Sequence, residues 1–555
     1  MRLLSVLFPG LLLVIILGCN GENTPAIYTM NIEITPVVGG SVIPSENMQI
    51  VSGEDIRIMA LNEVGYTFTG WSGDINSKDN PFELTVNNDL DITAEFTIRN
   101  YPLTITKIGS GTVTETLIQT PQKTDYDHGS VVQVQAIPDD SWEFTGWTGD
   151  IESTDSVLTL TIASEINLVA NFDVDRLDPV DVPKSNDMMV YIHYMPWFTT
   201  GDFDGSWSSH WTMANRDPET IVDGKREIAS HFYPLIGPYS TNDPDVIEYH
   251  LLLMKLIGID GVLIDWYGTY NLNDYDENLK GSNNVIDLMD EVGLNYGIVY
   301  EDRTTQQVVN AGLATSSIEA ATNDFNYVEA NYFNDENYIT IDDTPLALVF
   351  TPVHIESGTA WNTILSGLDP NPLFLSIWGE KNDLGTEGDG EYSWVYNGNN
   401  NHAQLVQNFY NNQINSFTVG MGSAYPGFVD FYEEGGYGNI IGWEIQHNGT
   451  QTLEQMLEMA STANIDHLQL VTWNDFGEGT MLEPTDEFGF DFLIKIQEFT
   501  GVPFDESDLQ LVYDLYLKRK AHASDSAIQN KLNLVFNYLI TLQMDEAKAL
   551  LDQID

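Results

Sequence analysis

The sequence predicts a multidomain protein: two small all-β repeat modules, then an α/β domain of the (β/α)8 TIM-barrel class, then a C-terminal helical hairpin. Three observations predict this order. A tryptophan-containing stretch near the N-terminus recurs once, with strand-like alternation around each copy. Eight short apolar runs then alternate with segments of helical spacing. After residue 501 the apolar residues recur only at helical spacing.

The repeated modules are expected at residues 28–98 and 100–173. Residues 68–75 (FTGWSGDI) recur 76 positions later as FTGWTGDI, and alternating strand patterns with glycine-rich turns surround both copies. Trp71 and Trp147 are expected to fill the module cores, with sugar-stacking platforms as the alternative. The pattern resembles the divergent internalin-B-type repeat of bacterial surface proteins, and we interpret the pair as a spacer.

The barrel is expected over residues 188–502, after a linker at 174–187 that is rich in Asp, Pro and Val. A helical C-terminal segment is expected over 503–555. A doubly wound open sheet is the alternative fold, and the lack of a glycine-rich phosphate loop after the first strand weakens it. The predicted strands are the apolar runs at 188–192, 261–265, 296–300, 346–350, 373–377, 417–420, 440–443 and 468–473.

Residues 1–19 have the proportions of a signal peptide. A nearly continuous apolar stretch follows Arg2 and is too short for a membrane span. It ends at Cys19, the only cysteine in the chain. This resembles the bacterial lipobox, whose cysteine is lipidated, and an ordinary cleaved signal is the alternative. The resemblance implies an exported protein that is anchored in a membrane through Cys19, with delivery to the outer membrane facing the cell surface expected because Asn20 is not Asp.

The charge excludes some partners. With 83 acidic and 21 basic residues the formal net charge is −62, and nucleic-acid binding is not expected because it needs clustered Lys and Arg. Only eight Lys or Arg residues fall between 188 and 500, which disfavours a heavily sulfated or uronic polysaccharide. A single cysteine and the absence of metal-ligand spacings predict no metal and no cofactor.

Candidate site residues are expected where the predicted strands end, because barrel active sites lie at the carboxyl ends of the strands. Nearly every strand end carries an aromatic residue and a carboxylate, a combination that favours a sugar-binding groove lined with acids. His210, Trp211 and His231 lie in the long segment after the first strand and are expected to cover this groove. The predicted substrate-binding residues are Tyr194, Trp197, Trp211, His231, Tyr233, Asp265, Trp266, Tyr267, Trp378, Tyr425 and Asn474.

Asp475 and Glu478 are the sharpest candidates for catalysis. Glycosidic cleavage uses one carboxylic acid to protonate the leaving oxygen and a second carboxylate as base or nucleophile. Two acids three residues apart, on a loop that leaves a strand, are able to face one cleft. Gly477 and Gly479 flank Glu478 and allow the backbone to turn. A surface loop in a very acidic protein is the alternative interpretation of the spacing.

Residues 472–478 (TWNDFGE) resemble motifs of two glycoside hydrolase families. They are similar to the Trp-Asn-Asp-Tyr/Trp-Gly-Glu motif of family 71, the endo-α-1,3-glucanases, and to the Phe-Asn-Glu-Trp-His-Glu-Gly motif of family 99, the endo-α-1,2-mannosidases. Residues 193–197 (HYMPW), 258–267 and 481–484 also look like family 99. The resemblance covers roughly residues 188–500 and implies a (β/α)8 barrel that needs no metal.

The resemblance also implies roles for the acids. Glu478 matches the general acid of both families. Asp475 matches the water-activating base of family 71 and stands where family 99 has a Glu that assists through the sugar 2-hydroxyl, so inversion and retention both stay open. Glu301, after the third strand, is the third catalytic candidate, and an ion pair with Arg303 is the alternative role.

We therefore expect a cell-surface, endo-acting glycoside hydrolase that cleaves internal α-glycosidic bonds of a polysaccharide of the α-mannan or α-glucan type. A non-catalytic glycan-binding surface lipoprotein is the alternative from another functional class.

Overall fold

The computed structural model describes residues 25–45, 47–118, 125–139, 142–174, 177–398, 401–438 and 441–554. The chain divides into two compact units, Met1–Asp173 and Val174–Asp555. The first holds the predicted repeats and the second holds the barrel and the C-terminal helices. Cys19 and the predicted signal peptide lie outside the described residues.

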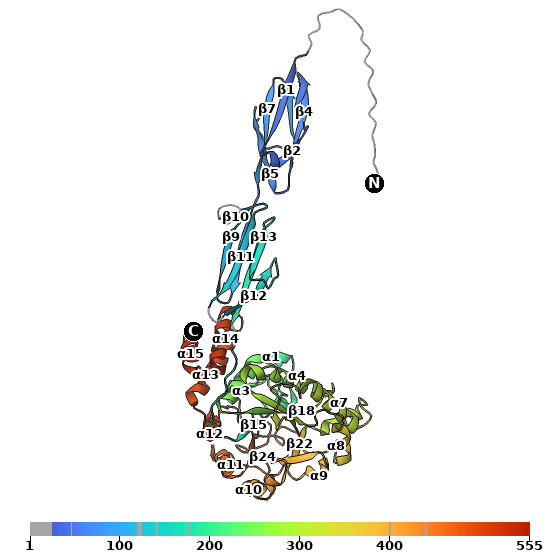
Figure 1. Cartoon of the computed structure of the whole chain (residues 1–555), viewed down its shortest axis with the longest axis vertical. Coiled ribbons are helices and arrows are strands. Elements are labelled where there is room, and N and C mark those ends of the chain that lie inside the picture. The colour runs from blue at the N-terminus through green and yellow to red at the C-terminus, as the bar shows by residue number, and fades with distance from the viewer. Residues whose placement is uncertain are drawn as a thin grey trace, which may run out of the picture. The chain divides into compact units, whose positions relative to one another are not determined.

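Each repeat folds as a small pair of β-sheets (Figure 1). In the first module the sheets have the strand orders β3–β1–β7–β5 and β2–β4–β6, and in the second β10–β8–β14–β12 and β13–β11–β9. The first module contains β1 (Ile27–Thr35), β2 (Gly40–Ile43), β3 (Met48–Val51), β4 (Glu54–Asn62), β5 (Tyr66–Gly73), β6 (Phe82–Val86) and β7 (Leu90–Ile98). The second contains β8 (Asn100–Ile108), β9 (Gly111–Leu117), β10 (Asp125–Asp127), β11 (Val131–Pro138), β12 (Trp142–Gly149), β13 (Val157–Thr161) and β14 (Ile166–Val174).

The repeated tryptophans fill the module cores, which confirms the expectation. Trp71 and Trp147 are each 1 % exposed. Each indole Nε1 donates to a backbone carbonyl eight residues on, of Asp79 and Asp155, at 2.9 Å. The two copies therefore share their packing as well as their sequence, and neither tryptophan offers a face to a sugar.

The second unit is built on a closed barrel of eight parallel strands (Figure 1). β19 pairs with β21, and β25 pairs back to β15 with Met189 opposite His467, so the sheet has no open edge. The predicted barrel is confirmed and the open-sheet alternative is excluded. Its strands are β15 (Met189–Tyr194), β18 (Gly261–Trp266), β19 (Asn295–Tyr300), β21 (Thr344–Val349), β22 (Leu373–Ile377), β23 (Gly388–Tyr392), β24 (Val419–Ala424) and β25 (His467–Leu470). Three short strands, β16 (Ile221–Val222), β17 (Lys225–Arg226) and β20 (Thr340–Ile341), lie outside the barrel wall.

One predicted strand was wrong. The apolar run at 440–443 is not a strand, since its described residues 441–443 are irregular, and β23 takes the missing place between β22 and β24. β23 was not predicted because its sequence, GDGEY, is rich in glycine and acidic residues and has no apolar run. A Cβ on Gly390 would lie 1.6 Å from the Val419 carbonyl oxygen, so the neighbouring strand leaves no room for a side chain there.

Helices follow the strands and cover the barrel (Figure 1). α3 illustrates the local logic: Asp243 caps its N-terminus by accepting from the Asp245 amide, Pro244 begins it, and its apolar residues are buried. The helices before the C-terminal segment are α1 (Gly201–Asp204), α2 (Ser209–Thr212), α3 (Pro244–Leu256), α4 (Tyr275–Ile286), α5 (Met289–Val292), α6 (Arg303–Asn310), α7 (Ser317–Asn331), α8 (Gly358–Leu365), α9 (Lys381–Leu384), α10 (His402–Asn412), α11 (Gln451–Thr462) and α12 (Asp491–Thr500).

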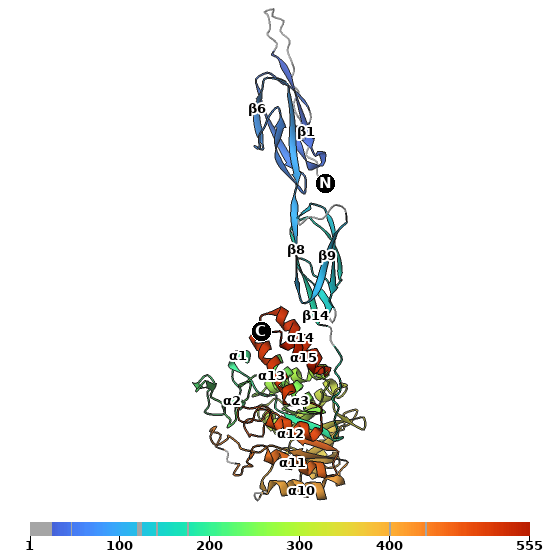
Figure 2. The same cartoon turned by 90° about the vertical axis from the view of Figure 1, so that its left-hand side faces the viewer.

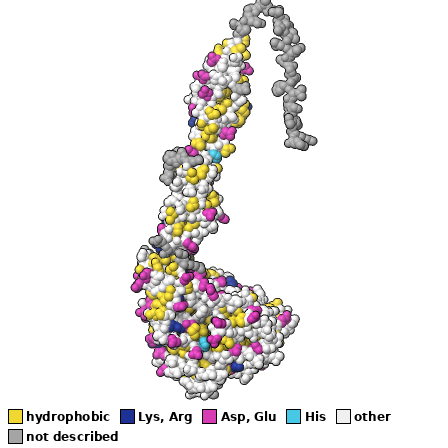
Figure 3. Space-filling view, viewed as in Figure 1, with side chains coloured by type: hydrophobic (Ala, Val, Ile, Leu, Met, Phe, Trp, Pro, Cys, Tyr) yellow, Lys and Arg dark blue, Asp and Glu magenta, His cyan; other side chains and the backbone are white. Residues whose placement is uncertain are grey.

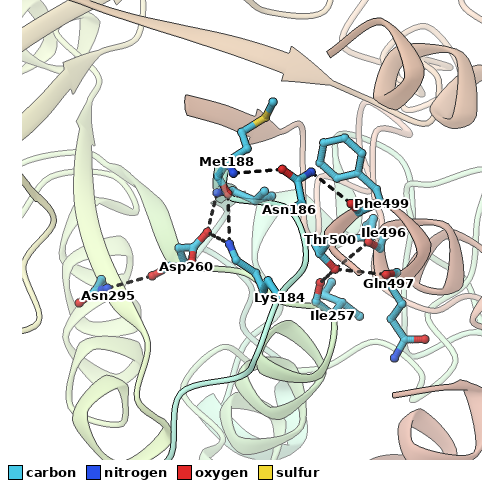
Figure 4. Close-up of polar contacts among 11 residues, drawn as sticks. Lys184, Asn186, Met188, Ile257, Asp260, Asn295, Ile496, Gln497, Phe499 and Thr500 are labelled. Carbon is cyan, nitrogen blue, oxygen red and sulfur yellow. Dashed lines mark hydrogen bonds and ion pairs between the residues drawn. The ribbon is translucent and has the colours of Figure 1, made fainter. Parts of the chain in front are cut away.

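The end of the predicted linker is fastened to the barrel (Figure 4). Lys184 pairs with Asp260, whose carboxylate also accepts the Val190 amide at 2.7 Å. Asn186 donates its side-chain amide to the Phe499 carbonyl at 3.1 Å. These polar side chains satisfy backbone groups near the start of β15 and the end of α12. The segment just before the first barrel strand is therefore part of the barrel unit and not a free tether.

The C-terminal segment holds three helices, one more than the predicted hairpin: α13 (Glu506–Ala521), α14 (Ser526–Ile540) and α15 (Met544–Leu551) (Figure 2). The second helix of the predicted hairpin is divided into α14 and α15 near Leu542, which has a φ of +61°. α13 packs on α3, where a bidentate ion pair joins Arg519 to Glu248 at 2.8 Å. No helix in the described ranges is long and apolar enough to span a membrane.

Candidate active site

Asp475 and Glu478 lie on the loop that follows β25. The Asp475 amide donates to Thr472 Oγ1 at 2.9 Å, and Asp475 Oδ1 accepts the Glu478 amide at 3.0 Å. The Thr480 amide donates to the Asp475 carbonyl at 3.2 Å. Gly479 has a φ of +65°, a left-handed conformation that favours glycine. Asp475 therefore fixes the turn that presents Glu478, and both carboxyl groups belong to one tight loop.

A second segment, residues 428–432, holds the loop that carries Asp475 and Glu478. The Val429 amide donates to the Glu478 carbonyl and the Phe431 amide to the Gly477 carbonyl, both at 2.9 Å. The Tyr432 hydroxyl donates to Glu478 Oε1 at 2.9 Å. The backbone and the side chain of Glu478 are therefore both positioned by residues outside its own loop.

The surroundings of the two acids give them different pKa values. Asp475 is 7 % exposed, and burial raises its pKa to about 6, while the hydrogen bond that it accepts from the Glu478 amide acts to lower this pKa. Burial raises the pKa of Glu478 to about 8, and the negative charge of Asp475 adds to this shift. The Tyr432 hydroxyl and the Arg303 guanidinium oppose it. Near neutral pH the arrangement therefore favours a protonated Glu478 beside an ionised Asp475.

Two more carboxyl groups and one guanidinium complete the cluster. Arg303 binds both oxygens of Glu301, through Nη2 at 2.7 Å and Nε at 2.6 Å. Burial raises the pKa of Glu301, while Arg303 lowers it. Burial raises the pKa of Asp265 well above its usual range, and the negative charges of Glu301, Asp475 and Glu478 act in the same direction. The ends of β18, β19 and β25 thus bring four acids together, and Glu301 makes the ion pair that was the alternative for it.

An aromatic wall stands beside this cluster. The rings of Trp197 and His210 stack with centroids 4.0 Å apart and planes 8° apart, and Tyr267 lies 5.9 Å from Trp197. His210 Nε2 lies 3.2 Å from Asp274 Oδ2. The charge of His210 lowers the pKa of Asp475, so the wall lies near the carboxyl pair. Trp197 is 9 % exposed, while His210 and Tyr267 are half-buried, so the accessible part of this wall comes from His210 and Tyr267.

Comparisons with known proteins agree with this geometry. Residues 185–314 match the family described as glycosyl hydrolase family 99. The glycoprotein endo-α-1,2-mannosidase of Mus musculus is 22 % identical over 363 residues, which are 58 % of this chain and 70 % of that protein. The enzyme of the same name from Xenopus laevis is 23 % identical over 348 residues, 56 % of this chain and 72 % of that protein. The barrel is a glycoside hydrolase domain, and its first part, residues 185–314, is similar to family 99.

The repeats and the solved structures complete the comparison. Residues 30–100 and 101–176 match the divergent InlB B-repeat domain, so two such repeats precede the hydrolase domain. The structure of a GH99 endo-α-mannosidase from Bacteroides thetaiotaomicron aligns with 18 % identity over 59 % of this chain and 99 % of that chain, with a TM-score of 0.43.

Several predicted substrate-binding residues are fully buried and support the loop of Asp475 and Glu478. Asn474 accepts a hydrogen bond from the Met195 amide at 2.8 Å and donates one to the Met195 carbonyl at 3.0 Å, which joins the loop of Asp475 and Glu478 to the end of β15. Trp211 is fully buried and donates Nε1 to the Tyr239 carbonyl at 2.9 Å. Tyr194 is also fully buried, and its hydroxyl lies 3.2 Å from His250 Nδ1. None of these three side chains is exposed.

His250 and Glu483 extend this buried support. Glu483 Oε2 accepts the Tyr239 hydroxyl at 2.6 Å, and Glu483 Oε1 lies 3.3 Å from His250 Nε2. The Tyr239 hydroxyl in turn accepts from Asn474 Nδ2 at 3.2 Å. A buried set of polar side chains therefore runs from α3 to the loop of Asp475 and Glu478, and its hydrogen bonds among Glu483, Tyr239 and Asn474 help to position this loop.

The other predicted binding residues lie away from the carboxyl cluster. Trp266 packs on Tyr300, Tyr327 and Tyr332, because strand alternation directs it opposite to Asp265. Tyr425 is fully buried against His402, and Trp378 packs on Phe409 of α10. His231 is exposed beside Phe431, and Tyr233 lies under Lys225. The structure brings none of these five into contact with Asp475 or Glu478.

The prediction missed Tyr432 and the role of His447. His447 is 5 % exposed, and its Nε2 lies 2.9 Å from the Gly479 carbonyl oxygen. Burial lowers the pKa of His447 to about 4, so near neutral pH the ring that contacts this carbonyl oxygen is uncharged. Both residues follow β24, a region where the strand at 440–443 was misassigned. Within the described residues no group of three or more His, Cys, Asp or Glu side chains is arranged to hold a metal ion.

Proposed function

We propose that this hydrolase cleaves internal α-glycosidic bonds of a polysaccharide, of the α-mannan type first and the α-glucan type second. The observation that carries the proposal is the pair of carboxyl groups on one loop. Burial raises the pKa of Glu478 to about 8, while the hydrogen bond from the Glu478 amide opposes the rise of the Asp475 pKa, which reaches about 6, so near neutral pH a protonated acid lies beside an ionised one. The names of the curated relatives, endo-α-1,2-mannosidases, favour mannose-containing substrates.

In the proposed mechanism Glu478 is the general acid. Its carboxyl proton passes to the glycosidic oxygen as the bond from that oxygen to the anomeric carbon breaks, which leaves Glu478 ionised. Tyr432 donates to the same carboxyl group and stabilises the charge that forms there. Asp475 accepts a proton from the nucleophile by one of two routes. In one route the oxygen of the deprotonated water bonds to the anomeric carbon and inverts it. In the other route the 2-oxygen of the sugar bonds to the anomeric carbon, and a water then opens the three-membered ring, so that two displacements retain the configuration.

Glu301 and Arg303 have a supporting role in this scheme. Arg303 neutralises Glu301 and lowers the pKa of Glu478, so it keeps the acid within reach of neutral pH. Burial raises the pKa of Asp265 well above its usual range and so favours its neutral form, which is able to donate a hydrogen bond to a sugar hydroxyl.

A comparison of hydrolysis with binding tests the proposal. Native protein is expected to release reducing ends from α-mannan or α-glucan, and Glu478→Gln is expected to bind the same glycan and release none. Glu458→Gln, on the exposed face of α11, makes the same change in charge and serves as the control. Binding without product from the native protein would instead identify a non-catalytic glycan-binding protein.

We also propose that the protein is exported and anchored through lipid on Cys19, in the outer membrane facing the cell surface. The apolar stretch that ends at this single cysteine supports the proposal. Metabolic labelling with palmitate is expected to mark the native chain and not Cys19→Ser. Equal labelling of both would remove Cys19 as the anchor.

A further inference from the structure

A hollow of about 330 Å³ lies beside the catalytic loop, between residues 430–434 and 441–444. This volume falls in the range that small-ligand sites occupy. The mechanism proposed above assigns no role to it. Four carboxylates line it together with the indole of Trp443: Asp430, Glu433, Glu434 and Glu444.

The segment that lines the hollow also holds the catalytic acid. Tyr432 stands between Asp430 and Glu433 in sequence, and its hydroxyl donates to Glu478 Oε1 at 2.9 Å. The negative charge of Asp430 raises the pKa of Glu478, which places this carboxylate near the acid. A polysaccharide chain bound across Glu478 has to continue past the scissile bond, and the hollow is where one end of the chain is able to go.

Trp443 gives the hollow an apolar wall. The indole is half-buried and rests on Phe428 with ring centroids 4.4 Å apart, while Tyr396 meets its edge at 5.8 Å. Behind it Asn397 is 9 % exposed and donates Nδ2 to the Glu444 carbonyl at 2.8 Å. An aromatic face beside carboxylate acceptors suits the apolar face and the hydroxyl donors of a sugar ring.

The charge of the hollow decides which sugars fit. Carboxylates only accept hydrogen bonds, and no Lys or Arg is among the described residues that line the hollow. Figure 3 shows the same imbalance on the visible face of the barrel unit, where magenta acidic side chains are spread widely and dark blue basic ones are few. A ligand here therefore has to offer hydroxyl donors and carry no negative charge.

We propose that this hollow is a further sugar subsite, which holds a neutral unit of the same polysaccharide and rejects units that carry phosphate, sulfate or carboxylate. The inference rests on the proposed hydrolase function and deepens it. It makes Trp443 the residue that senses chain length, and Glu433 and Glu434 the residues that select against anionic substituents.

The test uses the full chain and two lengths of neutral α-mannan oligosaccharide, one short and one long enough to enter the hollow. Trp443→Ala is expected to lower kcat/KM about tenfold for the long substrate and to leave the short one nearly unchanged. The native enzyme is expected to prefer the neutral long substrate at least about tenfold over the same chain carrying phosphate. The double variant Glu433→Gln/Glu434→Gln is expected to reduce the preference for the neutral substrate. Added salt is expected to do the same, because both changes weaken the repulsion between the carboxylates and the phosphate.

Glu458→Gln keeps native values and is the control for charge. Glu444→Gln provides a second variant if thermal unfolding shows that Trp443→Ala is not folded. Equal effects of Trp443→Ala on both lengths, or an unchanged preference in the Glu433/Glu434 variant, would overturn the subsite and leave the hydrolase standing. Absence of hydrolysis by the native enzyme would overturn the hydrolase, and loss of long-chain binding in Trp443→Ala, measured by calorimetry, would then still support the hollow.

Discussion

Replacing Tyr432 by Phe removes one hydroxyl group and leaves the ring in place. That hydroxyl donates to Glu478 Oε1 at 2.9 Å and stabilises the ionised carboxylate more than the neutral acid. Its loss therefore raises the pKa of Glu478. A hydrogen bond to a charged group contributes about 1.5–3 kcal/mol, and one pKa unit corresponds to about 1.4 kcal/mol. Since Tyr432 is only half-buried and water replaces part of the bond, we expect a rise of about one unit.

The assay is the pH dependence of kcat/KM. The alkaline limb, which follows Glu478 at about 8 in the native enzyme, should move up by about one unit in Tyr432→Phe. The acidic limb, which follows Asp475 at about 6, should stay in place. Tyr437→Phe makes the same substitution on a neighbouring exposed ring and should leave both limbs unchanged. An alkaline limb that stays or moves down would refute the reasoning.

Three further predictions concern the catalytic base, the loop support and the repeats. Asp475→Asn should lower kcat/KM at least about 10³-fold while glycan binding persists, and wild-type turnover in this variant would remove Asp475 from the mechanism. Burial lowers the pKa of His447 to about 4, so the folded state favours the neutral ring, and the free energy of unfolding should fall by up to about 3 kcal/mol as pH drops from about 6.5 to about 4. Urea denaturation of His447→Gln should lose this component, and an unchanged pH slope would contradict it. Trp71→Ala should destabilise the first repeat by about 3–5 kcal/mol, visible in near-UV circular dichroism, and loss of hydrolysis of a soluble oligosaccharide would contradict the division into two units.

The sequence predicted the barrel because most of its strands are continuous apolar runs bounded by turns. The prediction was wrong at β23, because Gly388 and Gly390 occupy positions where strand-forming residues are expected. The apolar run at 440–443 was predicted as a strand instead. In the structure Trp443 of that run packs on Phe428 beside the hollow, so its apolar character serves local packing and not a strand. Composition alone did not distinguish these two uses of apolar residues.

The carboxyl cluster could be predicted because strand ends converge at one face of a barrel. The sequence could not predict which side chains lie next to this cluster, because that depends on the direction of each side chain at the strand end. Asp265 joins the cluster, and its neighbour Trp266 points to the other face of the barrel sheet and packs on Tyr327 of α7. Tyr432 carried no local signal, since its contact with Glu478 joins residues 46 positions apart.

The most direct test of the central claim is the dependence of activity on the leaving group. If Glu478 is the general acid, Glu478→Gln should lose activity on a native glycosidic bond and retain much of it on a substrate whose leaving group needs no proton, such as a glycosyl fluoride. Asp475→Asn should lose activity on both. Equal losses of Glu478→Gln on the two substrates would contradict the assignment of Glu478 as the acid.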